Sequence, residues 1–223
     1  MELVVDVRAV AKTYRTKATE VRAVRNATFS LHAGEFVALT GQSGCGKSTL
    51  LNLLACVDSP SSGSIIIEGR DVSGLGDDDL TRVRRERIGY VFQFFNLIPT
   101  MTVRENVELP LLLAGAARAK ANAAVDDALE RTSIVDQAAK LPAYLSGGQQ
   151  QRAAIARAVV HAPALVLADE PTGNLDSTTG VEILALLRAC ATRGAAVLMA
   201  THSVEAAARA DRRLLMRDGA FEA

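Results

Sequence analysis

The 223-residue sequence lacks the features that mark membrane-spanning, secreted or strongly charged proteins. Its 25 lysines and arginines balance 25 aspartates and glutamates, so net charge gives no reason to expect nucleic acid or anionic lipid as a partner. The longest apolar runs, such as Ala162–Ala168 and Ala195–Ala200, fall far short of the roughly 20 residues that a membrane-spanning helix needs. No basic region followed by a long apolar stretch stands at the N-terminus, so we expect no signal peptide.

Cysteine is scarce as well. The three cysteines, Cys45, Cys56 and Cys190, are odd in number and widely spaced, so they form neither a disulfide framework nor a zinc site. Hydrophobic residues make up 49% of the chain and charged residues 22%, which is typical of a folded globular domain and not of a disordered one. We therefore expect a reduced, cytosolic protein.

The first part of the chain favours β-structure. Apolar runs at Leu3–Val7, Val21–Val24 and Ala27–Leu31 predict short strands, and Phe36–Leu39 predicts a buried strand that leads directly into a helix. A further helix is expected over Asp77–Arg87, because acidic residues open it and basic residues close it, as the helix dipole prefers.

The second part of the chain favours helices and then an alternation of strands and helices. Residues 103–141 are expected to be helical with breaks at Pro110 and Gly115, and Ser146–Val160 reads as one helix. Short buried strands follow at Ala164–Ala168 and Ala195–Ala200. This order predicts an α/β fold with a mainly parallel sheet covered by helices on both faces, in which residues 94–160 form a helical lobe between core segments 1–93 and 161–223.

Residues 41–48 match the phosphate-binding pattern known as the P-loop. Glycines let the backbone turn tightly and bring its N–H groups onto phosphate oxygens, and the following helix points its positive end at them. Lys47 is predicted to reach the β- and γ-phosphates and Ser48 to hold Mg²⁺. A glycine-rich turn with an incidental lysine is the alternative interpretation. The predicted nucleotide-binding residues here are Gly41, Gln42, Ser43, Gly44, Cys45, Gly46, Lys47, Ser48 and Thr49.

An apolar strand that ends in two acids supplies the second half of this candidate site. Asp169 closes the run from Ala164 and is predicted to hold Mg²⁺, while Glu170 can point at an attacking water. Ligands bind at the carboxyl ends of strands in open α/β sheets, which is where both acids would lie. The alternative is that the two acids are only structural.

A third motif indicates a family. Residues 145–152, Leu-Ser-Gly-Gly-Gln-Gln-Gln-Arg, match the signature of ATP-binding-cassette (ABC) ATPases, and the chain resembles that family over essentially its whole length. Other positions that resemble the family's motifs are Tyr14 (the aromatic that stacks on adenine), Gln93 (Q-loop), Asn174–Asp176 (D-loop) and His202 (switch histidine). The resemblance implies ATP as the nucleotide and a P-loop NTPase fold with an N-terminal antiparallel β subdomain and an inserted helical subdomain.

The signature lies where a helix is expected to begin. Ser146 is a good cap, and Gly147 and Gly148 let a γ-phosphate approach the backbone N–H groups, so this is a second predicted anion site. A helix of about 15 residues spans roughly 22 Å and would hold the signature away from its own P-loop. The resemblance implies that two copies pack head to tail around ATP, so a homodimer is expected, with Gln149 and Asp176 also near the nucleotide.

The resemblance also implies a role for each site residue. Lys47 would stabilise the transferring phosphoryl group, Ser48, Gln93 and Asp169 would organise Mg²⁺, Glu170 would act as general base, and His202 would contact the γ-phosphate. Two positions have a plainer alternative interpretation: Tyr14 as an ordinary surface aromatic and His202 as a helix-cap residue.

The sequence is similar to the ATPases of the lipoprotein-release, macrolide-export and cell-division group. That similarity implies a separate membrane permease as partner and a location on the cytoplasmic face of the inner membrane. The apolar loop Phe94–Met101 is the expected groove for a coupling helix of the permease, unless it only covers the core of the helical lobe.

Two other functional classes stay open on the sequence. A soluble ABC ATPase acting on nucleic acid or ribosomes usually carries two cassettes, long inserts or basic tails, and none is visible. A P-loop kinase would lack the signature and the switch histidine. Separately, Cys45 lies inside the P-loop, where backbone amides and Lys47 favour a thiolate, so we expect it to be exposed and to react first with a maleimide.

Overall fold

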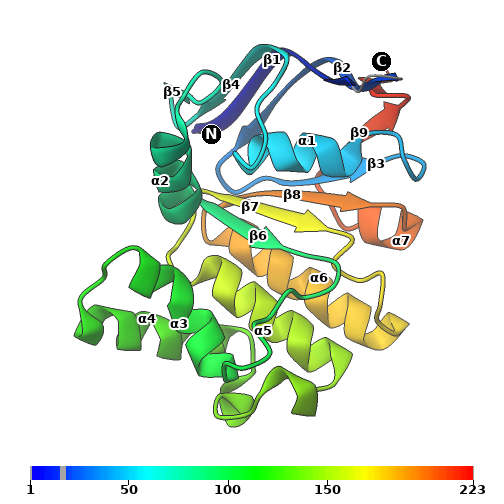
Figure 1. The fold of residues 1–223 in the computed structure, drawn as a ribbon. Helices are drawn as coiled ribbons and strands as arrows, with labels where there is room; N and C mark the ends of the chain where they lie inside the picture. Colours follow the sequence, from blue (N-terminus) through cyan, green and yellow to red (C-terminus); the bar gives the residue numbers. More distant parts are fainter. Residues whose placement is uncertain (1, 16–18, 223) are drawn as a thin grey trace.

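The computed structural model describes residues 2–15 and 19–222, which form two β-sheets with helices around them (Figure 1). The smaller sheet is antiparallel, with strand order β2-β1-β4-β5. Its strands are β1 (Leu3–Arg15), β2 (Glu20–His32), β4 (Ser62–Ile67) and β5 (Arg70–Asp71). The short runs expected at the start of the chain therefore merge into two long strands. The pairing of β1 with β2 shifts register between Val7 and Val10 and beyond, and bulges of this kind let a strand continue through an irregular stretch.

The main sheet is parallel except at one edge, with strand order β10-β9-β3-β8-β7-β6. Its strands are β3 (Phe36–Thr40), β6 (Ile88–Val91), β7 (Leu165–Asp169), β8 (Ala196–Thr201), β9 (Arg212–Arg217) and β10 (Ala220–Phe221). Because β3, β8, β7 and β6 run in the same direction, the segments that follow them meet at one edge of the sheet. This edge holds the candidate site.

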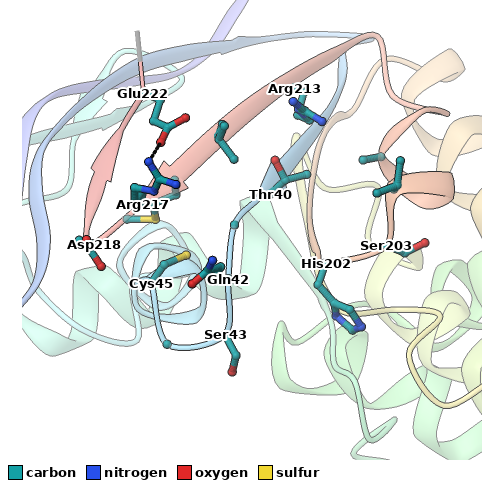
Figure 2. Close-up of a pocket in the computed structure, with 16 residues that line it drawn as sticks. Thr40, Gln42, Ser43, Cys45, His202, Ser203, Arg213, Arg217, Asp218 and Glu222 are labelled. Carbon is teal, nitrogen blue, oxygen red and sulfur yellow. Dashed lines mark ion pairs between the residues drawn. The ribbon is translucent and has the colours of Figure 1, made fainter.

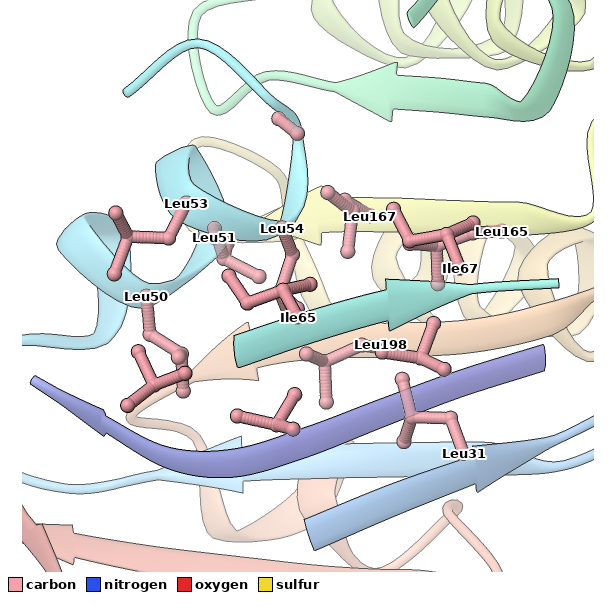
Figure 3. Close-up of a cluster of buried hydrophobic side chains, with 14 of the residues drawn as sticks. Leu31, Leu50, Leu51, Leu53, Leu54, Ile65, Ile67, Leu165, Leu167 and Leu198 are labelled. Atoms are coloured by element: carbon pink, nitrogen blue, oxygen red, sulfur yellow. The ribbon is translucent and has the colours of Figure 1, made fainter. Parts of the chain in front are cut away.

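Alternate residues of the central strands face two separate cores. Val37 and Leu39 of β3 join a cluster with helix α1 (Lys47–Leu54) and the smaller sheet, whereas Phe36 and Ala38 face the opposite side. Figure 3 shows the first cluster, in which leucines of α1 and isoleucines of β4 lie over β7 and β8. The other face is covered by α5 (Gly147–Val159), α6 (Ser177–Thr192) and α7 (Val204–Ala207). Burial on both faces explains why these strands read as continuous apolar runs.

The helical region has a third core of its own. It includes side chains of α3 (Val103–Leu113), α4 (Arg118–Arg131) and α5. Pro110 lies inside α3, so the break predicted there is wrong, whereas the chain does leave the helix at Gly115, which has a φ of 70°. The helix predicted over Asp77–Arg87 is present as α2, within the same bounds. None of the helices in the described part of the chain is both long and apolar enough to cross a membrane.

Candidate functional site

A cavity of about 930 Å³ opens at the carboxyl edge of the main sheet. Its walls come from the loop after β3, from the residues that end or follow β6, β7 and β8, and from parts of β1 and β2. The fold thus brings together residues up to 205 positions apart, counted from Tyr14 to Gly219. Its lining includes the predicted site residues Tyr14, Ser43, Gly44, Cys45, Gly46, Lys47, Ser48, Thr49, Gln93, Asp169, Glu170 and His202.

A smaller cavity of about 470 Å³ adjoins the first and is lined by the P-loop, by β9 and by residues after β8 (Figure 2). Gly41 and Gln42, also predicted to bind nucleotide, line this smaller cavity rather than the larger one. Figure 2 shows Gln42 and Cys45 on the inner side of the loop and Ser43 pointing away from it. The two cavities share lining residues, including His202, so we treat them as parts of one site.

The P-loop is shaped for close backbone approach. Gly46 has a φ of 108°, and a Cβ added there would collide with the carbonyl oxygen of Ala23. Lys47 is 8% exposed, and its Nζ donates hydrogen bonds to the carbonyl oxygens of Gly41 at 2.7 Å and Gln42 at 3.0 Å. Helix α1 has no side-chain cap and no acid in its first turn, so its first N–H groups stay available. These amides and the adjacent ammonium group fit a phosphate.

Ser48 and Asp169 line the same cavity. Burial raises the pKa of Asp169, and the charge of Glu170 adds to this, while the hydrogen bond with Ser48 and the charge of Lys47 oppose it. A hydroxyl, one carboxylate and the amide oxygen of Gln93 are the hard oxygen donors that Mg²⁺ prefers, with waters and phosphate oxygens completing its shell. The described residues contain no group of three or more histidine, cysteine or acidic side chains that would hold a metal alone. The donor set therefore fits a magnesium ion that arrives with a nucleotide.

Glu170 is fixed by three contacts from β8 and the residues after it. Its backbone N–H donates to the carbonyl oxygen of Ala200, and its φ of 45° places it in the left-handed region. The Thr201 hydroxyl donates to Oε2 at 3.2 Å, and Nδ1 of His202 lies 2.8 Å from Oε1. Because a carboxylate only accepts, Nδ1 donates in this bond, which leaves Nε2 for another partner. A carboxylate held in this way is suited to orient a water molecule.

The segment after Glu170 contacts the segment after β6. The side-chain amide of Asn174 donates to the backbone oxygen of Gln93 at 3.1 Å, and a Cβ on Gly173 would lie 3.4 Å from Nε2 of Gln93. Asp176 does not line either cavity at this edge. It caps α6 instead, where it accepts hydrogen bonds from the backbone N–H and the hydroxyl of Thr179.

The signature residues lie apart from the P-loop. In Figure 1, α5 and α1 cover opposite faces of the main sheet. Ser146 and Gln149 form a capping box at the start of α5, and neither lines a cavity at the carboxyl edge. Gly148 packs α5 against α6, since a Cβ there would lie 2.5 Å from Cγ2 of Thr179. One chain therefore does not bring its own signature to its own P-loop.

Comparison with known proteins decides the family. Residues 24–173 match the family model described as ABC transporter. The chain belongs to this family. It is 45% identical over 216 residues to the pyoverdine export ATP-binding/permease protein PvdT of Pseudomonas aeruginosa, which covers 96% of this chain and 33% of that protein. It is 44% identical over 210 residues to the macrolide export ATP-binding/permease protein MacB of Brucella melitensis, which covers 94% of this chain and 32% of that protein. The chain thus spans about a third of the length of these relatives.

A solved structure matches the whole cassette. The bacterial ABC transporter cassette MJ0796, determined as a dimer, superposes with a TM-score of 0.90 at 40% identity, covering 98% of this chain and 97% of that one. The same cassette was also determined in a dimeric post-hydrolysis state bound to ADP and Pi, with the same TM-score and identity. The ABC fold predicted from the sequence motifs is therefore confirmed, and this chain is an ATP-binding cassette.

Tyr14 lines the larger cavity at the carboxyl edge of the main sheet. Its hydroxyl donates to Asp58 Oδ2 at 2.8 Å, and Lys12 Nζ lies 5.0 Å from its ring centroid. Burial and the neighbouring Asp58 raise the pKa of the phenol. The ring is 40% exposed, which leaves it available for stacking, although its role stays a prediction.

The expectation of an exposed Cys45 is wrong. Cys45 is 7% exposed and belongs to the first core, because its sulfur turns inward to within 2.6 Å of where a Cβ on Gly41 would lie. Cys56 is also buried, and burial raises the pKa of its thiol to about 11. Cys190 is half-buried and is the most accessible of the three cysteines.

The loop Phe94–Met101 is partly exposed and partly packed on the helical lobe. Phe94 is 70% exposed, whereas Leu97 packs on the core of the helical lobe. Asn106, which is fully buried, holds the loop by donating to the carbonyl oxygens of Ile98 and Met101. The exposed part suited to a partner is therefore narrower than the sequence suggests.

Sequence reasoning missed four residues that organise either the site or the neighbouring loop Phe94–Met101. Thr201 was overlooked because it directly precedes the motif residue His202, although a hydroxyl next to a motif histidine can indicate a site residue. Asn106 interrupts an apolar helix face, which is a stronger signal. Asp58 and Arg157 act through contacts between distant segments, with Tyr14 and with the backbone of residues 95 and 96, that no local pattern reveals.

Proposed function

We propose that this ABC cassette hydrolyses ATP and thereby powers a membrane permease of the export type. The observation that carries the proposal is the cluster of Glu170, Thr201 and His202, which faces the P-loop across one cavity. The names of the relatives PvdT and MacB support export as the coupled process. No match reported above favours the alternative of a soluble ATPase acting on nucleic acid or ribosomes.

The residues would divide the work of hydrolysis among them. Lys47 and the first amides of α1 would stabilise charge on the transferring phosphoryl group. Glu170 would accept a proton from the attacking water, with its carboxylate oriented by Thr201 and His202. Ser48, Gln93 and Asp169 would hold Mg²⁺, which when bound neutralises charge on the phosphates.

A second copy of the chain would complete the site. The signature residues Ser146, Gly147, Gly148 and Gln149 lie outside the cavity of their own chain, so in this proposal they close on the nucleotide of a partner copy in the ATP-bound state. The dimeric form of the MJ0796 cassette supports this arrangement. Asp176, at the start of α6, would lie near the same seam.

The proposed contact with the permease is the loop Phe94–Met101, with residues 94–160 acting as the lobe that carries both this loop and the signature. Phe94 is the largest exposed apolar side chain there. Docking on the permease would place the cassette at the cytoplasmic face of the membrane.

Replacing Glu170 with glutamine tests the hydrolysis proposal. The amide keeps the size of the side chain but cannot accept the proton, so steady-state turnover should fall by about 10²–10⁴-fold while ATP binding remains. Light scattering should then show a dimer that persists with ATP. The matched control is Glu205→Gln on α7, an exposed acid outside both cavities, which should hydrolyse ATP normally. Near-normal turnover by Glu170→Gln would remove Glu170 as the base.

A further inference from the structure

A separate cavity of about 470 Å³ lies at the other end of β7 and β8, where these strands begin. Ala164 and Ala195, which directly precede the two strands, contribute to its wall together with the last turns of α5 and α6. It shares no lining residue with the cavity of about 930 Å³ at the carboxyl edge of the sheet. Its volume lies within the range of about 300–1,000 Å³ that is typical of small-molecule sites. None of the roles proposed for ATP hydrolysis uses it.

The floor of this cavity is apolar and rigid. Ile155 and Val166 are fully buried, and Val159 is 8% exposed, so all three belong to the core beneath the main sheet. Leu186 of α6 packs on the same core and completes the floor. A ligand seated here would rest on side chains that are already fixed by packing. The floor therefore favours a ligand with an apolar body.

Arginines surround this apolar floor. The lining includes Arg87, Arg131 and Arg193, and the only acid among the lining residues that the structure describes is Glu68, which lies 3.4 Å from Arg87. Arg131 is paired with Asp127 through Nε at 3.1 Å, and its two terminal nitrogens have no further ion pair or side-chain hydrogen bond within the described residues. Arg193 has no ion-pair partner within residues 2–15 and 19–222. Two guanidinium groups are thus left with donors to offer.

Cys190 lines the cavity together with these two arginines. Its thiol donates to the carbonyl oxygen of Leu186, and burial raises its pKa, while the nearby charges of Arg131 and Arg193 act in the opposite direction. The same cavity is therefore lined by both arginines and by this thiol. This sulfur provides a chemical reporter inside the cavity.

The ends of helices near the cavity do not cancel this positive charge. Helix C-termini carry partial negative charge that would repel an anion. Here the last carbonyl groups of α6 already accept hydrogen bonds from the amides of Arg193, Gly194 and Ala195. At the end of α4, the carbonyl oxygen of the capping residue Thr132 accepts a hydrogen bond from the guanidinium group of Arg152. The formal charges of the arginines are therefore the larger influence.

We propose that this cavity binds an amphipathic organic anion, with its apolar body on Ile155, Val159, Val166 and Leu186 and its carboxylate or phosphate head held by Arg131 and Arg193. Guanidinium groups suit such a head because they offer paired donors in a plane. The occupant would touch α5 and the sheet at once, so it would bridge the helical lobe and the core of the cassette. The site is independent of ATP hydrolysis and is tested without it.

The test compares two thiol reagents on the full chain without nucleotide. Dithiobis(nitrobenzoate) is an aromatic disulfide with two carboxylates, and dithiodipyridine is its neutral counterpart. Both exchange with a thiolate and release a coloured thiol. We expect the anionic reagent to label Cys190 before the other cysteines. In the Arg131→Gln/Arg193→Gln double variant, labelling of Cys190 by the anionic reagent should be about tenfold slower, while labelling by the neutral reagent changes little. Cys190→Ser should lose the fast phase altogether.

Protection by decanoate measures binding directly. Decanoate should slow labelling of Cys190 in the natural sequence and not in the double variant, whereas ATP should give no protection. Arg118→Gln, which removes an exposed arginine of the same lobe outside the cavity, is the matched control and should be protected normally. The single variant Arg193→Gln is included in case the double variant misfolds, because the Arg193 side chain has no ion pair to lose among the described residues.

Three results would overturn the proposal. The first is equal loss of rate with both reagents in the arginine variants that retain nucleotide binding. The second is protection by decanoate that persists in those variants, which would mean non-specific binding. The third is a fast phase that survives in Cys190→Ser, which would place the reactive thiol elsewhere.

Discussion

The helices α1 and α5 begin in opposite ways, although both start at predicted anion sites. Helix α1 follows Gly46 and has no side-chain cap, so no side chain accepts a hydrogen bond from its first backbone amides. The ammonium group of Lys47 lies beside them. Helix α5 follows Ser146, which forms a complete capping box with Gln149. The P-loop therefore leaves donors for a ligand to satisfy, whereas the signature is satisfied by its own side chains before any ligand arrives.

The difference fits two different tasks. A loop with unsatisfied amides gains free energy when phosphate binds, because the ligand supplies the missing acceptors. A capped helix start gains less free energy when a phosphate binds, but its conformation is already fixed in the absence of a partner. The glycines of the two sites differ in the same sense, since Gly46 needs a left-handed backbone, whereas Gly148 serves close packing against Thr179. Three variants test this comparison.

The largest effect is expected for Gly46→Ala. The added Cβ would collide with the backbone of β2, and an alanine held at a φ of 108° would also be strained. Nucleotide binding, measured with a fluorescent ATP analogue, should weaken by at least about 100-fold, or about 2.7 kcal/mol. Gly44→Ala is the matched control, because its φ is also positive but the space around it is open. If both variants lose binding equally, backbone strain and not the collision is responsible.

Gly148→Ala should act on assembly and not on binding to the single chain. The new methyl would press on Cγ2 of Thr179, so α5 would move from α6 and ATP-dependent dimerisation should fall about tenfold, while binding of the analogue stays unchanged. Adding Thr179→Ser removes that methyl but keeps the hydroxyl that bonds Asp176. Recovery of thermal stability without recovery of the dimer would show that close approach of a ligand to Gly148, and not packing, requires the glycine.

The smallest effect is expected for Ser146→Ala. Loss of the cap should cost about 1 kcal/mol, which lowers Tm by roughly 2–4 °C in a chain of this size. Thr102→Ala removes the cap from a second capping box, at the start of α3 in the same lobe, and should cost as much. Only Ser146→Ala should also weaken the ATP-dependent dimer in sedimentation experiments. If the two variants behave alike, Ser146 is a structural cap and does not contact the nucleotide of a partner copy.

Local patterns predicted local structure well. The acidic start and basic end of Asp77–Arg87 predicted α2 within its observed bounds, and Ser146 predicted the start of α5. Pro110 misled the prediction because α3 tolerates a proline inside it, with its buried face held by Val103, Val107 and Leu111. Tertiary packing outweighed the local cost of proline there. The separate runs in the first 40 residues likewise merged, since two paired strands can absorb the bulges between them.

The sequence by itself determined which chemistry this chain carries. The P-loop pattern, the two acids after an apolar strand and the signature each depend on backbone conformation within a few residues, which glycines, caps and apolar runs control directly. Tertiary structure alone decided which of these groups meet. The strand order β9-β3-β8-β7-β6 places His202 2.8 Å from Glu170 and keeps the signature on the other face of the sheet. The packing of the chain also turns the Cys45 sulfur into the core and leaves an arginine-lined cavity beside Cys190. The physical reason is that neighbours across a sheet are set by the packing of the whole chain, which no local pattern records.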